Sequence, residues 1–458
     1  MSGPAAAHAA AVERTWSFLS GGARTVVVDS PPGAGKSTLV RQLAARLVDA
    51  GRQVPIITQT NDQADDLAAA IAATIAPARV GRLHAGGYAP PAPPAPPAPP
   101  APPAPPAPPA PPAAPAAPDS VAYSTRAADL AGCAVLVATA AKWAFVDATE
   151  HRFDLGIVDE AYQMSSAALV RVAELFDRLL LVGDPGQLSP FTVADEHVLR
   201  SYATWPLDTA AGTVLRNHPD TPVVPLPVSW RLPPSAATLV SDSFYTRGFR
   251  AGTRPGQRSV SIAEPGSDAY GAALETAAET GWSLLELPEA YLPRTDPAAV
   301  AAIATLVGRL TGTTVSTVDE NGTGRLAPGQ LAVGVTHRDQ RAFVTAALAA
   351  QGVPPGTVTV DTANRLQGRQ FEIVIAWHPL SGRRDASAFH LEAGRLCVLA
   401  SRHRHACVVV SRAGVAEQLA AYPADEPVWL GADPPQVDGW AANVTFQSHL
   451  DTVRVPLR

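Results

Sequence analysis

The sequence predicts an α/β protein with two parallel-sheet domains in tandem. Short apolar runs typical of buried strands lie in the first half at residues 25–29, 54–58, 135–139, 155–159 and 179–183. Similar runs lie in the second half at residues 331–336, 357–361, 371–377 and 407–411, with helical patterns at 339–350 and 391–401. Strands that are apolar throughout are buried on both faces, as in parallel sheets covered by helices on either side.

The length of the chain supports two domains. At 458 residues it exceeds what one hydrophobic core usually organises. The regular pattern gives way to polar and Pro-rich sequence near residues 208–222. We therefore expect a first domain at residues 1–215, a second at 216–424, and a segment at 425–458 that caps the second.

Composition narrows the class of protein. No apolar run is long enough to span a bilayer, and the N-terminus lacks the basic and apolar regions of a signal peptide, so we expect no membrane partner. Cys133, Cys397 and Cys407 are scattered, which argues against a disulfide framework or a zinc module and favours a cytoplasmic protein. The net charge of −6 does not exclude nucleic acid, because a basic footprint can be confined to one channel.

Residues 89–118 consist largely of Pro-Pro-Ala triplets. Without glycine at every third position this run cannot be collagen, so it predicts a polyproline II spacer within the first domain. One interpretation is a low-complexity expansion in a surface loop. The other is a docking site for a proline-recognising protein partner.

Residues 30–37 read Ser-Pro-Pro-Gly-Ala-Gly-Lys-Ser between a predicted strand and a predicted helix. Glycines let backbone amides cradle phosphate at a helix N-terminus, which predicts binding of ATP with Mg²⁺. Lys36 would reach the phosphates and Ser37 would hold Mg²⁺; apart from Lys142, Lys36 is the only lysine in the chain. The expected nucleotide-binding residues are Pro32, Gly33, Ala34, Gly35, Lys36, Ser37 and Thr38.

Two further motifs follow predicted strands. Asp159 and Glu160 end the run at 153–160, where Asp159 would hold Mg²⁺ and Glu160 would polarise the attacking water. Gln187 lies in the Gly-Asp-Pro-Gly-Gln-Leu sequence at 183–188. Each motif alone could be an ordinary strand end or turn, but their order after the phosphate loop favours a shared site.

In this order the motifs resemble those of the superfamily 1 helicases, in the branch of the RNA helicase of nonsense-mediated decay. The resemblance covers roughly residues 20–415. It includes motifs at residues 58–61, 137–139, 230–231, 360–369 and 395–404. It implies two RecA-like domains of the P-loop NTPase type, with ATP hydrolysis in the cleft between them. It also implies a single-stranded DNA or RNA partner and favours 5′-to-3′ movement.

The resemblance also implies roles for individual residues. Gln187 would sense the γ-phosphate, and Arg231 and Arg402 would clamp it across the cleft, although most arginines form surface salt bridges. Trp230 would stack on the base of ATP, with a plain core tryptophan as the alternative. Gly368 would lie at the nucleotide.

The expected nucleic-acid contacts are residues at strand ends. Hydroxyl and amide side chains there can meet phosphate oxygens, but Ser and Thr at such positions are also common turn formers. The set is Thr58, Thr60, Asn61, Thr139, Thr336, His337, Arg338 and Thr362.

Some positions depart from the family pattern. Gln370 replaces a glutamate, Cys397 replaces an asparagine, and no adenine-reading glutamine precedes the phosphate loop. The leading hypothesis is a nucleic-acid-dependent ATPase that translocates on or unwinds its track. The alternative is a nucleotide-switched clamp on nucleic acid or protein with little hydrolysis. A small-molecule kinase is disfavoured, because it predicts neither the Gln187 loop nor the arginines of a second domain.

Overall fold

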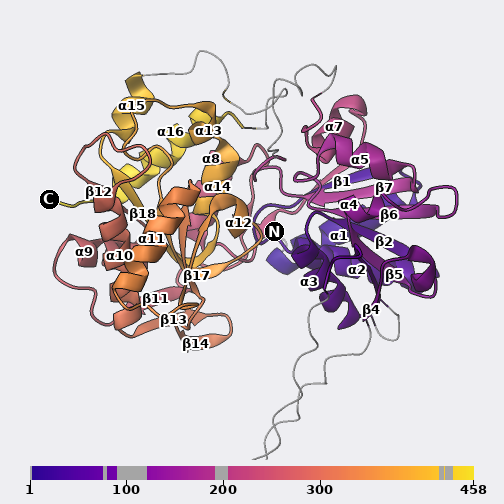
Figure 1. The fold of residues 1–458 in the computed structure, drawn as a ribbon, viewed down its shortest axis with the longest axis horizontal. Coiled ribbons are helices and arrows are strands. Elements are labelled where there is room, and N and C mark those ends of the chain that lie inside the picture. The colour runs from indigo at the N-terminus through magenta and orange to yellow at the C-terminus, as the bar shows by residue number, and fades with distance from the viewer. Residues whose placement is uncertain (1–2, 76–79, 90–120, 191–204, 422–427, 429–436) are drawn as a thin grey trace, which may run out of the picture.

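The computed structural model describes residues 3–75, 80–89, 121–190, 205–421, 428 and 437–458. It contains two parallel sheets, each covered by helices on both faces, which lie side by side in Figure 1. The predicted fold class, two parallel-sheet α/β domains in tandem, is therefore confirmed. The predicted Pro-rich spacer lies outside the described residues, apart from Ala89.

The first sheet has the strand order β4-β3-β5-β2-β6-β7-β1-β8 over the described part of the chain. All its pairings are parallel. Its strands are β1 (Thr25–Asp29), β2 (Val54–Thr58), β3 (Val80–Leu83), β4 (Val121–Ser124), β5 (Val135–Thr139), β6 (Phe153–Asp159), β7 (Phe176–Gly183) and β8 (Val223–Pro225). All five strands predicted in the first half are present.

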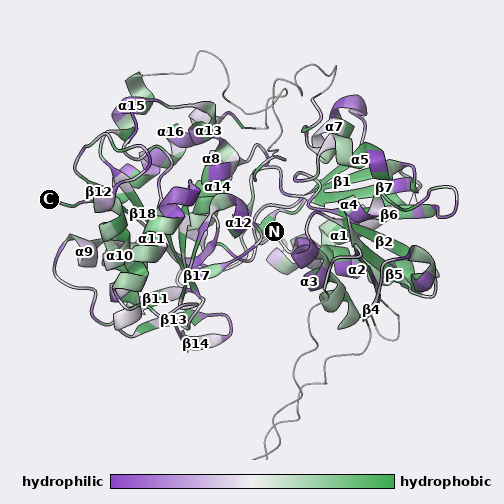
Figure 2. Ribbon diagram, in the orientation of Figure 1, coloured by the Kyte–Doolittle hydropathy of each residue, from purple (hydrophilic) through white to green (hydrophobic). Residues whose placement is uncertain are grey.

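The strands of this sheet are apolar on both faces because each face has its own core. In β1, Val26 and Val28 pack into one core, while Val27 packs into the other. The first core takes α1 (Pro4–Ser20), α2 (Lys36–Asp49) and α3 (Asn61–Ala72). The opposite core takes α4 (Ala140–Trp143), α5 (Ser166–Ala173) and α7 (Ala210–Asn217). Figure 2 shows the strands in green between helices whose outer faces are more polar.

The second sheet has the order β16-β15-β17-β18-β12-β19, again with parallel pairings among the described strands. Its strands are β12 (Trp282–Leu287), β15 (Leu331–Val335), β16 (Val358–Thr362), β17 (Phe371–Trp377), β18 (His403–Arg412) and β19 (Arg454–Pro456). One face is covered by α8 (Pro234–Phe244), α12 (Ala363–Leu366), α14 (Ala393–Ala400) and α16 (Gly439–Leu450). The other is covered by α9 (Ala269–Thr280), α10 (Pro297–Gly312) and α11 (Arg338–Ala350).

Smaller elements complete the second half. A three-stranded antiparallel sheet, β11 (Ser259–Ile262), β13 (Val315–Asp319) and β14 (Gly322–Arg325), was not predicted. The other small elements of this half are β9 (Val228–Ser229), β10 (Arg250–Ala251), α13 (Ala388–Leu391), α15 (Val415–Ala421) and the short 3₁₀ turn Asp451–Val453. In the first half, a short 3₁₀ turn at Ala127–Leu130 lies between β4 and β5. None of the helices described here is both long and apolar enough to cross a bilayer.

The chain passes from the first sheet to the second beside the phosphate loop. After β8 pairs with β1, Leu226 donates its amide to the carbonyl of Asp29 at 2.8 Å. The hydroxyl of Ser229 then donates to the carbonyl of Pro32 at 2.6 Å. The predicted boundary at residue 215 stays a prediction, and β8 lies beyond it in the first sheet.

Candidate functional site

The phosphate loop at residues 30–35 joins β1 to α2. Gly33 and Gly35 have φ angles of +70° and +87°, which the other residue types rarely adopt. No side chain caps the N-terminus of α2 at Lys36. The first-turn amides of this helix are therefore free to bind an anion.

Lys36 lies against the two acidic residues at the end of β6. Its Nζ is 3.3 Å from Oδ1 of Asp159 and forms a closer ion pair with Glu160. Burial lowers the pKa of Lys36, but the two carboxylates outweigh burial and raise it above its ordinary value. Burial also raises the pKa of Asp159, against the effect of Lys36. The structure thus brings three of the predicted catalytic and metal-binding groups together.

Glu160 has a strained backbone. Its φ of +57° lies in the left-handed region, and it is the one non-glycine residue of the described chain with a positive φ. Such strain costs of order 1–3 kcal/mol and persists where the surroundings enforce it, commonly at functional sites. The bend aims Glu160 back toward the phosphate loop, where it meets Lys36.

The loop after β7 carries Asp184 and Gln187. The Gln187 side-chain amide donates to Asp184 Oδ2, and the Gly186 amide donates to Asp184 Oδ1 at 3.1 Å. Burial raises the pKa of Asp184 to about 6, although its hydrogen bonds act in the opposite direction. Asp184 thereby fixes the Gln187 side chain in the loop after β7.

Arg231 and Arg402 bring two guanidinium groups to this site from the second half. Arg402 is fully buried and donates only to neutral oxygens, namely those of Val398, Ser401 and Arg369. Arg231 donates to Gln370 Oε1 and to the carbonyl of Ser401, both at 3.4 Å. Within the described residues neither forms an ion pair with a carboxylate, so the surface-salt-bridge alternative does not apply to them.

The two arginines share one electrostatic environment. Burial and then the charge of Arg402 lower the pKa of Arg231 to about 9. Burial likewise lowers the pKa of Arg402, while Asp184 and Glu160 of the first half raise it. Two neighbouring cations, one of them fully buried and neither in direct contact with a carboxylate of the described residues, repel each other, and an anion bound between them would relieve that repulsion.

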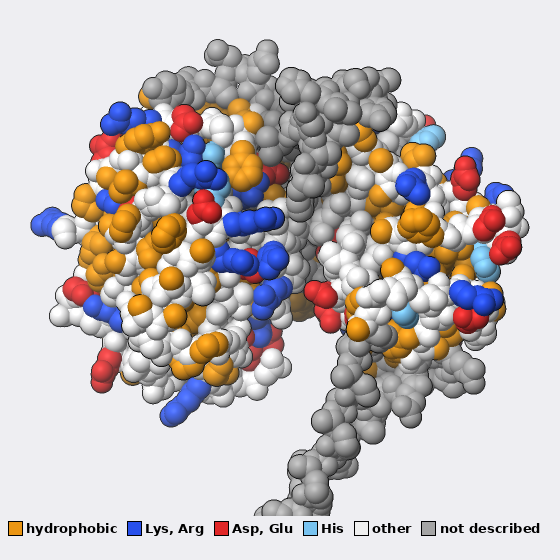
Figure 3. All heavy atoms as spheres, in the orientation of Figure 1, with side chains coloured by type: hydrophobic (Ala, Val, Ile, Leu, Met, Phe, Trp, Pro, Cys, Tyr) orange, Lys and Arg blue, Asp and Glu red, His pale blue; other side chains and the backbone are white. Residues whose placement is uncertain are grey.

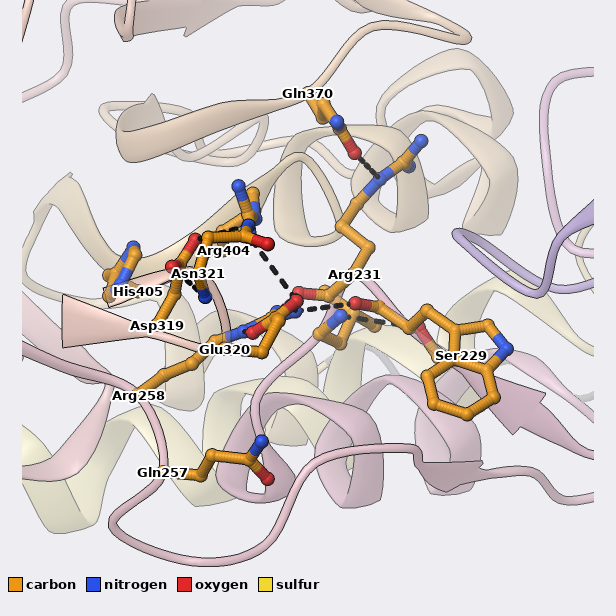
Figure 4. A network of polar contacts seen from close by, with 12 residues as sticks. Ser229, Arg231, Gln257, Arg258, Asp319, Glu320, Asn321, Gln370, Arg404 and His405 are labelled. Atoms are coloured by element: carbon orange, nitrogen blue, oxygen red, sulfur yellow. Dashed lines mark hydrogen bonds and ion pairs between the residues drawn. The ribbon is translucent and has the colours of Figure 1, made fainter. Parts of the chain in front are cut away.

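The backbone of Arg231 is fixed by a polar network (Figure 4). Arg258 donates to the carbonyl of Trp230 at 2.7 Å and to that of Arg231. Arg258 in turn pairs with Glu320, in the turn between β13 and β14, and Arg404 of β18 lies 3.3 Å from the same carboxylate. The hydrogen bonds from Arg258 lower the pKa of Glu320 to about 2, so this carboxylate is charged at neutral pH. The unpredicted antiparallel sheet therefore supports the candidate arginine pair.

Trp230 is 38 % exposed, which excludes the core-tryptophan alternative. Its indole packs on Gly252, where an added Cβ would lie 2.6 Å from Cε3. Gly368 has a φ of +80° and lies in the turn before β17, two residues from the Arg231 contact Gln370.

His8 of α1 is a residue of this site that sequence analysis missed. Its ring lies against the phosphate loop, where a Cβ on Gly35 would be 3.0 Å from Cε1 of His8. Its Nε2 is buried without a hydrogen-bond partner among the described atoms. A helical pattern alone could not have indicated which side chain of α1 reaches this loop.

A cavity of about 1210 Å³ lies between the two halves, on the other side of the Gln187 loop. Within the described part of the chain its lining includes six arginines and four carboxylates. These are Arg216, Arg294, Arg338, Arg341, Arg365 and Arg395, with Asp208, Asp339, Asp361 and Glu392. Figure 3 shows blue Lys and Arg side chains gathered on the second half of the chain, along the side that faces the first half. This excess of cations suits a polyanion despite the net charge of the chain.

The four track residues predicted in the second half line this cavity. They are Thr336, His337, Arg338 and Thr362. His337 stacks on Phe389 with ring centroids 5.5 Å apart, and burial lowers its pKa to about 4, so it is neutral at pH 7. Thr336 keeps a buried hydroxyl without a partner in the described structure.

The four track residues predicted in the first half do not line the cavity. Thr60 and Thr139 accept hydrogen bonds from backbone amides as helix N-caps, each at 3.2 Å. Thr58 is fully buried and donates to the carbonyl of Thr60, while Asn61 accepts from Arg82 at 2.8 Å. These side chains form local hydrogen bonds in turns and helix caps in this structure.

Comparisons with known proteins extend this picture. The sequence model of a family described as an AAA domain matches residues 17–192. None of the curated proteins compared matches the chain.

Several solved structures have a similar chain path at low identity. PRRSV helicase is 14% identical with a TM-score of 0.40, and the match covers 89% of this chain and 54% of the helicase chain. The arterivirus nonstructural protein 10 helicase with DNA is 13% identical with a TM-score of 0.40, covering 84% and 60%. The E. coli DExH-box NTPase HrpB is 15% identical with a TM-score of 0.41, covering 98% and 49%. The chain thus spans about half to three fifths of the length of these structures.

Proposed function

We propose that this chain is a nucleic-acid-dependent ATPase of the superfamily 1 helicase type, which translocates along single-stranded DNA or RNA. The observation that carries the proposal is the arginine pair formed by the half-buried Arg231 and the buried Arg402. Two guanidinium groups without a carboxylate partner lie across from a phosphate loop and two acidic residues. A γ-phosphate is the anion that fits between them, since a guanidinium fork matches phosphate oxygens.

The residues present also fit a magnesium ion. Asp159 and the exposed hydroxyl of Ser37 supply the oxygen ligands that Mg²⁺ prefers. The ion pair between Lys36 and Asp159, at 3.3 Å, supports the assignment of this carboxylate to a cation site. When bound, Mg²⁺ supplies charge neutralisation on the phosphates.

Each protein group then has a defined task. Lys36 exchanges its carboxylate partners for the β- and γ-phosphates, which leaves Glu160 free to accept the proton of the attacking water. Arg231 and Arg402 stabilise the charge that develops on the transferred phosphoryl group. Gln187 reports the state of that group to the cavity on the other side of its loop, where the track would lie.

The replacement of glutamate by Gln370 agrees with this assignment. Gln370 contacts Arg231 at 3.4 Å as a neutral acceptor. A carboxylate at that place would compensate the arginine and compete with the phosphate for it. Gln370 keeps the hydrogen bond but leaves the positive charge of Arg231 available.

The test is ATP hydrolysis by the purified chain alone, with single-stranded DNA and with single-stranded RNA. Lys36→Ala and Glu160→Gln should each abolish hydrolysis, while Lys142→Ala, at the only other lysine, should not change it. Strong stimulation by one polymer would establish the motor and identify its track. Hydrolysis that survives Lys36→Ala would refute the proposal. Tight polymer binding with ATP but negligible turnover would replace it with the nucleotide-switched clamp.

A further inference from the structure

Two contacts join the second half to neighbouring strand ends of the first. The hydroxyl of Tyr245, just after α8, donates to Asp184 Oδ1 at 2.6 Å. The guanidinium of Arg247 lies 3.5 Å from Asp29 Oδ2. Asp29 ends β1 and pairs in register with Gly183, the residue before Asp184. The segment 245–247 therefore meets two adjacent carboxylates at the same edge of the first sheet.

Tyr245 is closely fitted to the Gln187 loop. Its ring is buried, and a Cβ added to Gly186 would lie 2.5 Å from its Cζ, so only glycine allows this approach. Behind the ring, Phe249 packs edge-on at 5.1 Å between centroids. The hydroxyl is also 3.6 Å from Cys397 Sγ on α14, one of the positions that departs from the family pattern. One hydroxyl thus connects a loop of the first half to two helices of the second.

Asp29 depends on the second half for part of its charge compensation. It is buried beneath the phosphate loop and accepts a hydrogen bond from Tyr162 at 2.6 Å. Burial raises the pKa of Asp29, and both Tyr162 and Arg247 oppose that shift. When the two halves separate, Asp29 loses its cationic partner.

The Gln187 loop faces both sites. Asp184 receives Tyr245 on one oxygen and the Gln187 amide on the other. On the far side, Pro185, Gly186 and Gln187 line the cavity between the halves. The start of α14 supports the same loop, because a Cβ on Gly394 would lie 2.7 Å from the carbonyl of Gln187.

We propose that Tyr245 and Arg247 form an interdomain clasp, and that Tyr245 is a positioning residue that sets Gln187 for hydrolysis only when the halves are closed. The clasp rests on the proposed ATPase function for its catalytic consequence. Polymer in the cavity contacts residues of the second half and favours closure, which seats Tyr245 on Asp184. The clasp is thus the step by which the track stimulates hydrolysis.

Protonation of Asp184 gives the clasp a measurable signature. Besides Tyr245, the groups that face Asp184 are Cys397 on α14, Arg402 just after α14, Glu160 and Tyr162 after β6, and Arg231. The hydrogen bond from Tyr245 lowers the pKa of Asp184 toward its value of about 6. Removing the hydroxyl therefore raises that pKa further, because the charged form loses a donor.

The first experiment measures kcat and KM for ATP with and without single-stranded polymer from pH 5.5 to 8.5. Tyr245→Phe keeps the ring and removes the hydroxyl, with exposed Tyr291→Phe as its control. Arg247→Gln is matched by Arg254→Gln in a nearby exposed loop. We expect Tyr245→Phe to lower polymer stimulation of kcat by about tenfold, the scale of one charge-assisted hydrogen bond, with little change in KM. The acidic limb of the kcat–pH profile of Tyr245→Phe should shift to higher pH. Stimulation and pH profile equal to wild type would overturn the inference.

The second experiment measures closure without hydrolysis. The three native cysteines are buried, so dyes can be placed at Glu150→Cys and Gln351→Cys, both exposed and on opposite halves. Combining Tyr245→Phe with Arg247→Gln should increase the low-transfer population relative to the two controls. Unchanged energy transfer would contradict the clasp even in an active enzyme. If wild type shows no hydrolysis but the shift occurs, the clasp stands and the ATPase proposal fails.

Discussion

The amide of Trp230 donates a hydrogen bond to the carbonyl of Gly33 at 2.8 Å, so the segment that carries Arg231 is joined directly to the phosphate loop. The candidate nucleotide site is therefore joined to both halves through main-chain atoms. A change in the loop's shape must change the position of Arg231.

Gly33→Ala tests this connection. An added Cβ would collide with the Arg231 side chain and lie 2.8 Å from its amide. We expect ATP affinity to fall by more than tenfold, beyond the roughly 1 kcal/mol that a positive φ costs an alanine. Titration with a fluorescent ATP analogue measures the effect. Gly51→Ala is the control, since Gly51 also has a positive φ but open space around it. Equal losses in both variants would mean that backbone strain alone is responsible.

Arg402→Met should abolish ATP hydrolysis without destabilising the protein. Arg402 is buried without a carboxylate partner, so an apolar side chain of similar length removes an uncompensated charge. We expect the free energy of unfolding to stay the same or to rise by about 1 kcal/mol. Urea denaturation and steady-state hydrolysis measure the two quantities.

Arg412→Met is the matched control for that variant. Arg412 is also buried, but two of its nitrogens lie 2.7 Å from the carboxylate of Asp296. Breaking this pair leaves a buried carboxylate and should cost about 3–5 kcal/mol of stability. The activity of the folded fraction should persist. Comparable destabilisation in both variants would show that Arg402 is structural.

Acid should destabilise the fold through His403. His403 is fully buried and packs edge-on against Trp282, with ring centroids 4.8 Å apart. Burial lowers the pKa of His403 to about 3. In the unfolded state His403 is protonated below about pH 6.5, whereas in the folded state it stays neutral until the pH is much lower. The free energy of unfolding therefore falls as the pH drops below about 6.5. Between pH 7.5 and 5.0 this residue should cost about 2 kcal/mol.

His403→Leu isolates that contribution. We expect its free energy of unfolding to fall less between pH 7.5 and 5.0 than that of wild type, by about 2 kcal/mol. The exposed His218→Leu should change nothing. Urea denaturation at the two pH values measures this difference. A pH dependence of stability equal to that of wild type would contradict the contribution assigned to His403.

Arg338→Ala should weaken polymer binding in a salt-dependent way. Arg338 is exposed in the cavity and forms no ion pair within the described structure. If it contacts one phosphate, the slope of log K against log salt should decrease by about 0.7 for a single strand. Fluorescence anisotropy at four salt concentrations gives the slope, with Arg254→Ala as control. An unchanged slope would place the polymer elsewhere.

Sequence could predict the strands that form the site because their burial leaves an unbroken apolar pattern. The phosphate loop, Asp159 and Glu160 follow those strands at the same sheet edge, so their meeting was predictable. β3 was missed because Arg82 interrupts its pattern, although Asp65 and Asn61 satisfy this arginine and allow its complete burial.

Other long-range contacts could not be predicted from the sequence. Thr60 and Thr139 cap helices in the structure, a role that the sequence pattern did not separate from a phosphate contact, and their place at the track stays a prediction. His8 lies on a helix and Tyr245 directly follows one, and helical periodicity predicts a buried face but not the loop that this face contacts. The hairpin that supports Arg258 carries Gly, Ser and Thr, which indicate no strand until the partner strand is present.

The connection between the two sheets is also the wall of the nucleotide site, since Leu226, Ser229 and Trp230 bond in turn to Asp29, Pro32 and Gly33. If the proposed domain motion takes place, the residues that connect the two sheets are also those that contact the phosphate loop. Substitutions in residues 226–231 should therefore change the opening rate and the nucleotide dissociation rate together. In the proposed ATPase cycle, no substitution in this segment should change the rate of domain motion without also changing the lifetime of bound nucleotide.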